Sequence, residues 1–494
     1  MAIAGSTPSP APGATRADEL SPAGRAGGFP RGIWRWFVPP LTAGLVWLCP
    51  HAGFDAHAWG LLAIFAASIS GLVARPLPAG AVLVIGVSIA NALGLLTAQE
   101  ALSGFANTTV WLIVAAFIFS LGFRETRLGE RIACHVIARL GGSALRLGYA
   151  LVISDLLLGP LTASNTARAG GVIYPITRSI AGAFGSEPGP TANRLGAFLM
   201  KVVYHGDLVV SAMFVTAMAA NALLVELARQ TAGVRITWTQ WAWAALAPGL
   251  VGLALVPYAV YRLCPPEVQD TDEARKIARL RIIEMGPLGR AEKLMLAVFV
   301  PVLLLWVTEG WHGRSSTTVA LVGVSALLVA GVIRWRDVLG ERDVWDTLVW
   351  FGGIVMLAEQ LNKAGLVKAF AVSSSALVAG WRWLPALVVL FVIYFFAHYA
   401  FASSSAHVSA MFPAFLSVAL LLGAPPLLSG LAFGFCSNIY AATTHYGTGP
   451  AVVLYGAGYL SQTRWWRIGF VMSFVHLAIW LIVGFAWWKI IGLW

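Results

Sequence analysis

The chain has 494 residues, of which 58% are apolar and 11% are Asp, Glu, Lys or Arg. A soluble domain carries about 25% charged residues, so this composition excludes an ordinary soluble enzyme, which would expose too much apolar surface. The formal net charge of +11 is assigned to basic cytoplasmic loops of a membrane protein rather than to nucleic-acid binding. The four cysteines are scattered without metal-ligand spacing, so we predict no metal site and no cofactor.

Residues 1–30 are rich in Ala, Pro, Gly and Ser, and they predict a disordered cytoplasmic tail without the apolar run of a signal peptide. Beyond the tail, apolar runs of about 20 residues predict about eleven transmembrane helices, so the chain reads as an all-α polytopic membrane protein. The predicted spans lie near residues 34–50, 57–74, 78–96, 107–123, 197–228, 240–263, 291–309, 316–333, 344–361, 426–460 (broken) and 468–492.

Two further segments, 145–184 and 384–423, each hold two apolar arms joined by a small polar centre. Arms this short fit a re-entrant hairpin better than full spans, and such a break is tolerated in a membrane only inside protein or beside a cavity. We therefore predict a first half, 31–263, and a second half, 291–494, each containing one re-entrant hairpin.

The polar segment 264–290 separates the halves, and we interpret it as a cytoplasmic linker. Basic residues are densest at 124–146 and 262–293. The positive-inside rule then predicts a multi-pass protein of the bacterial inner membrane with a cytoplasmic N-terminus.

An internal repeat emerges when the sequence is shifted by 239 residues. The segment TTVW (108–111) then meets TLVW (347–350), and ASNTAR (163–168) meets ASSSAH (402–407). Five predicted spans separate the two hairpin centres, so the second hairpin must enter from the opposite face. This inverted-topology repeat is typical of secondary transporters and brings two hairpin tips together near the midplane.

The tips carry small hydroxyl and amide side chains where a helix restarts. A helix that restarts after a break offers free backbone N–H groups and a partial positive charge, so two such tips suit one carboxylate each. The alternative is that these residues merely cap helices. The candidate substrate-binding residues at the tips are Ser164, Asn165, Thr166, Ser403, Ser404 and Ser405.

Arg168 and His407 occupy equivalent positions just after the two tips. A charged residue inside a membrane usually has a function, so we predict that both place positive charge beside the substrate. The alternatives are a structural salt bridge for Arg168 and a neutral core histidine for His407. A second candidate segment is a broken run whose Gly and Pro free backbone groups, either to line the cavity or to allow close packing. Its residues are Gly447, Thr448, Gly449 and Pro450.

These motifs resemble the divalent anion–sodium symporter (DASS) family, and most closely its 2-oxoglutarate/malate translocators and citrate/succinate antiporters. The stretches that carry the resemblance are SNTARAGGVIYPI (164–176), MFVTAMAAN (213–221), FASSSAHVSAMFPAF (401–415) and THYGTGPAVVLYGAGY (444–459). The resemblance implies a homodimer in which a transport domain, 145–229 with 384–461, moves like an elevator.

The family has a Ser-Asn-Thr motif at each tip, and its asparagines help to build sodium sites in sodium-coupled members. The first tip matches fully, whereas Ser404 and Ser405 replace the asparagine and threonine of the second. We therefore predict sodium-independent exchange of di- or tricarboxylates, with small carboxylate anions and the lipid bilayer as partners. The alternatives are a sodium-coupled dicarboxylate symporter and, more distantly, an anion channel or a membrane enzyme, for which no convergent catalytic pair is evident.

Overall fold

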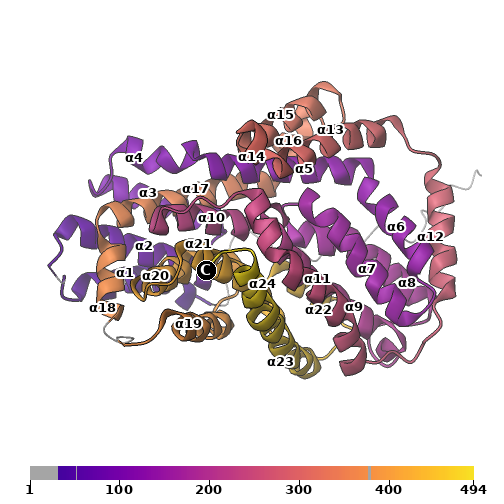
Figure 1. Cartoon of the computed structure of the whole chain (residues 1–494). Coiled ribbons are helices and arrows are strands. Elements are labelled where there is room, and N and C mark those ends of the chain that lie inside the picture. The colour runs from indigo at the N-terminus through magenta and orange to yellow at the C-terminus, as the bar shows by residue number, and fades with distance from the viewer. Residues whose placement is uncertain (1–31, 52, 376–379) are drawn as a thin grey trace, which may run out of the picture.

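The computed structural model describes residues 32–51, 53–375 and 380–494, so the predicted tail, 1–30, lies outside the described residues. The described part is built from helices, with one isolated β-bridge between Ser143 and Asp270. Each of the eleven predicted spans coincides with a helix or with an interrupted pair of helices, which confirms the all-α fold class (Figure 1).

The helices of the first half run from the first apolar span to the linker. They are α1 (Trp34–Leu48), α2 (Ala56–Ala74), α3 (Ala79–Ala92), α4 (Ala98–Leu102), α5 (Thr108–Thr126), α6 (Leu128–Leu140), α7 (Ala144–Leu158), α8 (Tyr174–Ala183), α9 (Gly196–Met213), α10 (Ala219–Ala232) and α11 (Trp238–Leu263). The linker forms α12 (Asp272–Met285). Short 3-10 or π-helical turns connect some of them: η2 (Ser103–Ala106), η3 (Gly159–Leu161), η4 (Thr166–Ile173), η5 (Ala192–Arg194) and η6 (Val215–Ala217).

The second half repeats this plan. Its helices are α13 (Arg290–Val307), α14 (Glu309–His312), α15 (Ser316–Val329), α16 (Trp335–Gly340), α17 (Arg342–Lys363), α18 (Leu366–Ser375), α19 (Trp383–Ala397), α20 (Ser404–Leu421), α21 (Pro426–Ile439), α22 (Gly449–Gly456), α23 (Gln462–Ala478) and α24 (Phe485–Ile490). Its short turns are η8 (His398–Ala400), η9 (Tyr440–Ala442) and η10 (Ile479–Gly484).

Six described helical segments are long and apolar enough to cross a membrane by length and composition. They are Ala56–Ala74, Thr108–Thr126, Trp238–Leu263, Trp383–Ala400, Ser404–Leu421 and Gln462–Ile490. Two of these, Trp383–Ala400 and Ser404–Leu421, are the arms of the second predicted hairpin. Their composition does not distinguish a re-entrant arm from a span, so the re-entrant course of this hairpin stays a prediction.

The first arms of the two hairpins begin and end at positions that differ by 239 residues, the offset of the sequence repeat. The first arms run from Ala144 to Leu158 and from Trp383 to Ala397, and η3 and η8 follow them at matching positions. In Figure 1 the arms α7 and α8 lie towards one end of the molecule, whereas α19 and α20 lie towards the other. The hairpins therefore approach the centre from opposite ends, as an inverted repeat requires.

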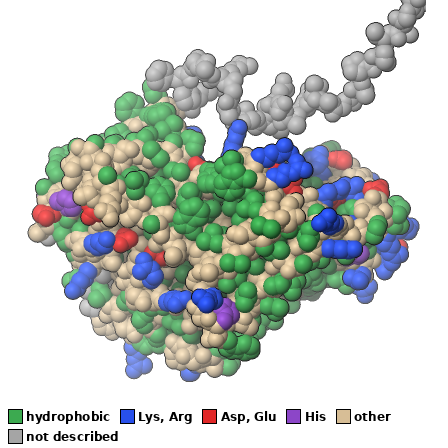
Figure 2. Space-filling model, turned by 90° about the horizontal axis from the view of Figure 1, so that it is seen from above, with side chains coloured by type: hydrophobic (Ala, Val, Ile, Leu, Met, Phe, Trp, Pro, Cys, Tyr) green, Lys and Arg blue, Asp and Glu red, His purple; other side chains and the backbone are tan. Residues whose placement is uncertain are grey.

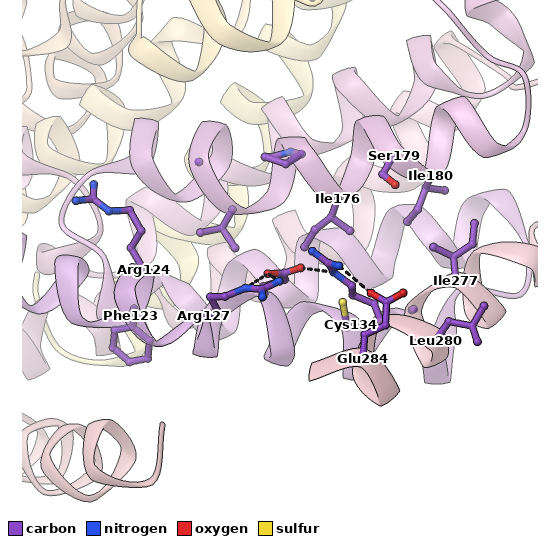
Figure 3. A pocket seen from close by; sticks show the side chains of 16 residues that line it. Phe123, Arg124, Arg127, Cys134, Ile176, Ser179, Ile180, Ile277, Leu280 and Glu284 are labelled. Atoms are coloured by element: carbon purple, nitrogen blue, oxygen red, sulfur yellow. Dashed lines mark hydrogen bonds and ion pairs between the residues drawn. The ribbon is translucent and has the colours of Figure 1, made fainter. Parts of the chain in front are cut away.

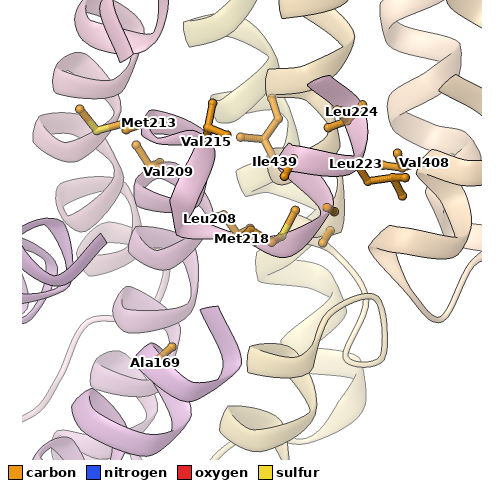
Figure 4. Packing of buried hydrophobic residues seen from close by; sticks show 14 of the residues in the cluster. Ala169, Leu208, Val209, Met213, Val215, Met218, Leu223, Leu224, Val408 and Ile439 are labelled. Atoms are coloured by element: carbon orange, nitrogen blue, oxygen red, sulfur yellow. The ribbon is translucent and has the colours of Figure 1, made fainter. Parts of the chain in front are cut away.

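The interior is organised around α9, whose residues are all buried. After the C-terminal end of α9 the helix is interrupted, and the chain restarts as α10, which packs against α17, α20 and α21. Figure 4 shows apolar side chains from α9, α10, α20 and α21 meeting around this break. The labelled members are Leu208, Val209, Met213, Val215, Met218, Leu223, Leu224, Val408 and Ile439, and Ala169 is labelled farther from the break. The break is thus enclosed by protein, the condition under which a non-helical segment survives at membrane depth.

The linker predicted at 264–290 is an ordered helix rather than a loose connection. Helix α12 packs against α6, and Arg281 of α12 contacts Glu130 of α6 at 2.8 Å. Figure 2 shows apolar side chains spread over the visible face, with many Lys and Arg side chains at the right-hand end, where Figure 1 places α6 and α12. Amphipathic helices carrying ion pairs are suited to a membrane surface.

A close contact between η2 and α17 depends on a glycine. A Cβ added to Gly104 would lie 1.9 Å from the carbonyl oxygen of Gly352, and neither backbone can move without displacing its helix. We expect Gly104→Ala to destabilise the protein by about 1–3 kcal/mol, because overpacking a core forces side-chain and backbone shifts that typically cost this much. Thermal unfolding in detergent measures the effect. Gly44→Ala is the control, since a Cβ at Gly44 of α1 meets no atom within 4 Å; equal melting of the two variants would contradict the prediction.

Candidate functional site

A cavity of about 220 Å³ lies where the two hairpin tips meet. The first tip contributes Ser164, Asn165 and Thr166, and the second contributes Ser403, Ser404 and Ser405. The structure therefore brings together all six residues predicted at the tips, although they are separated by more than two hundred residues in sequence.

Each tip is a break that ends in a serine cap. The Ser164 hydroxyl accepts a hydrogen bond from the backbone N–H of Ala167 at 3.1 Å, and the Ser403 hydroxyl accepts one from Ala406 at 3.4 Å. Serine is favoured at this position because it accepts a bond from an N–H that has no partner within the helix. The helix-capping alternative is thus realised at both tips, and the capped helix starts also face the cavity.

Two more helix starts border the same cavity. Helix α10 begins after the α9 break, and its first residues, Ala219 and Ala220, line the cavity together with Met218. Helix α22 begins at Gly449, where the Thr448 hydroxyl accepts from Ala451 N–H at 3.4 Å. The η4, α10, α20 and α22 segments therefore all start at the cavity. Each start adds a partial positive charge, so the cavity favours an anion.

The predicted segment 447–450 divides between the cavity and its support. Thr448 and Gly449 line the cavity. Gly447 lies behind it, and its carbonyl oxygen accepts a hydrogen bond from Nε2 of His398 at 3.2 Å. Pro450 occupies the first turn of α22, a position where its missing N–H carries no cost.

Gly449 allows the first tip to lie directly against α22. A Cβ at this position would lie 1.8 Å from Oγ1 of Thr166, far inside van der Waals contact. The sequence analysis raised two roles for this glycine, lining the cavity and allowing close packing. Both apply, because the close packing of the first tip against α22 forms the cavity wall.

Arg168 does not reach the cavity. Its side chain is fully buried and pairs with two carboxylates, Asp155 at 2.8 Å and Asp207 at 2.7 Å. The guanidinium also donates a hydrogen bond to the Ser211 hydroxyl. Its Nη1 donates to two backbone carbonyl oxygens, that of Ala217 in the break between α9 and α10 at 2.8 Å and that of Thr162 at the first tip at 3.3 Å. The geometry is that of the structural salt bridge weighed as the alternative, because both acids lie on neighbouring helices and compensate the charge of the guanidinium.

His407 also turns away from the cavity. It is buried and stacks on Tyr394 and Phe401 with ring centroids 4.5 and 4.7 Å apart. Its Nδ1 lies 3.2 Å from Nδ1 of His398. Because Nε2 of His398 donates to a carbonyl, a neutral His398 must accept at Nδ1, and His407 is the donor. The arrangement matches the neutral core histidine weighed as the alternative.

The sequence analysis missed several cavity residues that belong to other helices. Arg75 follows α2, Phe117 lies on α5, and Thr347 and Trp350 lie on α17. Thr347 and Trp350 belong to the TLVW segment, which aligns with TTVW in the internal repeat. Their presence in both halves could therefore have marked them as candidate site residues. Arg75 carried one signal only, a basic residue between two apolar runs and directly before Pro76.

A second cavity of about 610 Å³ lies between α6, the hairpin arm α8 and the linker helix α12 (Figure 3). Most of its charged side chains are paired with one another: Arg127 and Arg281 both contact Glu130 at 2.8 Å. Burial favours the neutral form of Glu130, but hydrogen bonds from Arg281 and Arg127 outweigh it and hold the pKa of this carboxyl below its ordinary value. Burial raises the pKa of the Cys134 thiol in this cavity to about 11, which keeps it protonated at neutral pH.

Comparison with known proteins agrees with this architecture. The profile of a family described as the sodium:sulfate symporter transmembrane region matches residues 31–494. The putative malate transporter YflS of Bacillus subtilis is 47% identical over 452 residues, which cover 91% of this chain and 95% of that protein. The chloroplastic dicarboxylate transporter 1 of Spinacia oleracea is 43% identical over 458 residues, covering 92% and 80%.

Two further proteins extend the comparison. The inner membrane protein YbhI of Escherichia coli is 37% identical over 472 residues, which cover 94% of this chain and 99% of that protein. The crystal structure of the YdaH transporter of Alcanivorax borkumensis superposes with a TM-score of 0.55 at 15% identity, covering 82% of this chain and 90% of that one. At this identity the likeness concerns the fold alone.

Proposed function

Since the chain belongs to the sodium:sulfate symporter (DASS) family, and is thus a multi-pass membrane transporter rather than an enzyme, we propose that it exchanges dicarboxylates across the bacterial inner membrane. The carboxylate class follows from the names of its relatives, a putative malate transporter and a dicarboxylate transporter. We also propose that its N-terminus lies in the cytoplasm, because the positive-inside rule predicts this orientation from the basic loops.

The observation that carries the proposal is the cavity between the tips. Four helix starts point at it, and its lining among the described residues contains hydroxyl groups and no carboxylate. A small anion with a charge at each end satisfies these donors from both tips at once. Six tip residues, Ser164, Asn165, Thr166, Ser403, Ser404 and Ser405, together with Thr448 and Gly449, are proposed to hold it.

Arg168 and His407 take a different role in this proposal from the one expected. The Arg168 guanidinium donates to carbonyl oxygens at both backbone breaks, and such oxygens are the ligands that hard cations prefer. The Arg168 guanidinium therefore takes up carbonyl ligands that a sodium ion would need. Together with the replaced asparagine at Ser404, this favours transport without sodium.

Exchange follows from the cost of moving an empty site. Without an anion, the hydroxyl groups and positive helix starts at the cavity have no anionic partner, and carrying them through apolar surroundings is unfavourable. A bound dicarboxylate pairs with them and lets the loaded unit move. The moving unit is proposed to comprise 145–229 and 384–461, sliding like an elevator against the remaining helices, and the assembly is proposed to be a homodimer.

The test is transport into proteoliposomes. Vesicles loaded with malate should take up labelled 2-oxoglutarate or malate at least about tenfold faster than vesicles without internal carboxylate, and a sodium gradient should change neither rate. Internal citrate, succinate, tartrate and sulfate define the exchange partners. Sodium-driven uptake into vesicles that lack internal anion would instead establish the symporter, and would overturn the proposal.

A further inference from the structure

Arg75 has a backbone conformation that its sequence disfavours. It ends α2 at φ 51° and ψ 55°, in the left-handed region where glycine is the usual residue. The next residue is Pro76, and a residue before proline prefers extended conformations. Strain of this kind persists where surrounding structure enforces it, and it gathers at functional sites.

The electrostatic position of Arg75 is equally distinct. Among the described residues that line the cavity between the tips, Arg75 is the only charged one. It forms no ion pair with any carboxylate in the described part of the chain. This sets it apart from Arg168, whose charge is compensated by two aspartates.

The guanidinium also keeps most of its donors available. Its Nη2 donates to the backbone carbonyl of Ala402 at 2.7 Å, beside the Ser403 cap of the second tip. A guanidinium has five N–H donors, and this is its one side-chain hydrogen bond to the described protein atoms. The bond holds the planar group against the tip while its other edge stays open.

From these observations we propose that Arg75 binds one carboxylate of the transported anion directly. The guanidinium fork matches a carboxylate with two parallel hydrogen bonds, while the helix starts at the tips receive the other end of the molecule. The proposal rests on the proposed function in one respect, that the anion is a dicarboxylate. It adds that the anion has two anchors, the helix starts at the tips for one carboxylate and Arg75 for the other. Arg75 lies in the α2–α3 turn, outside both hairpins.

This arrangement predicts a preference for two charges. A monocarboxylate engages only one anchor, so it binds much more weakly than a dicarboxylate of the same size. Arg75 also lies outside the segments that are proposed to move, so it strengthens binding in the arrangement of the hairpins seen here.

The experiment measures anion binding to purified full-length protein by the ligand-induced rise in melting temperature, with malate, 2-oxoglutarate and sulfate as probes. Three variants are compared, Arg75→Gln, Arg75→Lys and Arg75→Gly. The glycine variant removes the side chain and suits the left-handed backbone, so it should melt no lower than wild type without ligand. The matched control is Arg127→Gln, because Arg127 has the same backbone class, with φ 57°, but pairs with Glu130 and does not line the cavity between the tips.

We expect malate affinity to fall about ten- to hundredfold in the glutamine and glycine variants, in line with loss of a charge-assisted pair, and less in Arg75→Lys. Arg127→Gln should bind as wild type does. Malate affinity within twofold of wild type in both Arg75→Gln and Arg75→Gly would overturn the proposal. If wild type binds sulfate but no dicarboxylate, the proposed function fails; the assignment of Arg75 then stands if sulfate binding weakens in the same variants, and falls if it does not.

Discussion

Gly449→Ala should lower the transport rate about a hundredfold while the protein still reaches the membrane. The added Cβ would lie 1.8 Å from Oγ1 of Thr166, so the first tip must retreat from α22 by more than an ångström. Displacements of this size at a binding site cost about two orders of magnitude, because the donors no longer converge on the ligand. The exchange rate in proteoliposomes, normalised to inserted protein, measures the effect.

The control is Gly456→Ala at the other end of the same helix, where a Cβ would meet no atom within 4 Å. It should exchange at the wild-type rate. A second-site test is Thr166→Ala combined with Gly449→Ala. It removes the hydroxyl responsible for the closest approach but leaves the Thr166 Cβ at 2.9 Å, so recovery should be partial. Full activity of Gly449→Ala alone would show that the tip and α22 do not meet this closely during transport.

Arg168→Met is expected to abolish folding rather than only weaken substrate binding. It leaves Asp155 and Asp207 buried without their partner, and removing one side of a buried ion pair costs about 3–5 kcal/mol. Arg168→Lys should also destabilise the protein, since an ammonium cannot reproduce a guanidinium that contacts two acids, one hydroxyl and two carbonyl oxygens. Folded yield on size exclusion and melting temperature in detergent report the loss.

Two variants separate this prediction from a role in binding. Arg178→Met lies on the same hairpin but removes an exposed arginine whose one side-chain hydrogen bond among the described residues is to the Tyr174 hydroxyl, at 3.3 Å, so its stability should be unchanged. Arg168→Met with Asp155→Asn and Asp207→Asn removes all three charges and should recover part of the folded yield. An Arg168→Met protein that melts like wild type but binds malate weakly would restore the binding role first expected for this residue.

The sequence predicted the helices, the hairpins and the meeting of the tips because each leaves a local trace. Apolar length marks the helices, and the repeat at 239 residues places Ser164 and Ser403 in equivalent breaks. The direction of the Arg168 side chain left no such trace, because its two acids lie on different helices and at separations unrelated to helical periodicity. Arg75 was missed for a similar reason: its contact with Ala402 spans 327 positions, and only the folded chain shows which arginine of a basic protein lies beside the tips.

The two halves bury equivalent positions with unlike chemistry. Arg168 and Asp155 form an ion pair in one half, whereas the residues 239 positions later, His407 and Tyr394, stack as rings. A carrier assembled from two copies of an ancestral unit would be free to rest equally on either side of the bilayer if those copies had stayed alike. Under the proposed elevator mechanism the two mirror-related states would contain different interactions and differ in energy, so the divergence of the duplicated halves would set the side on which the unloaded carrier rests.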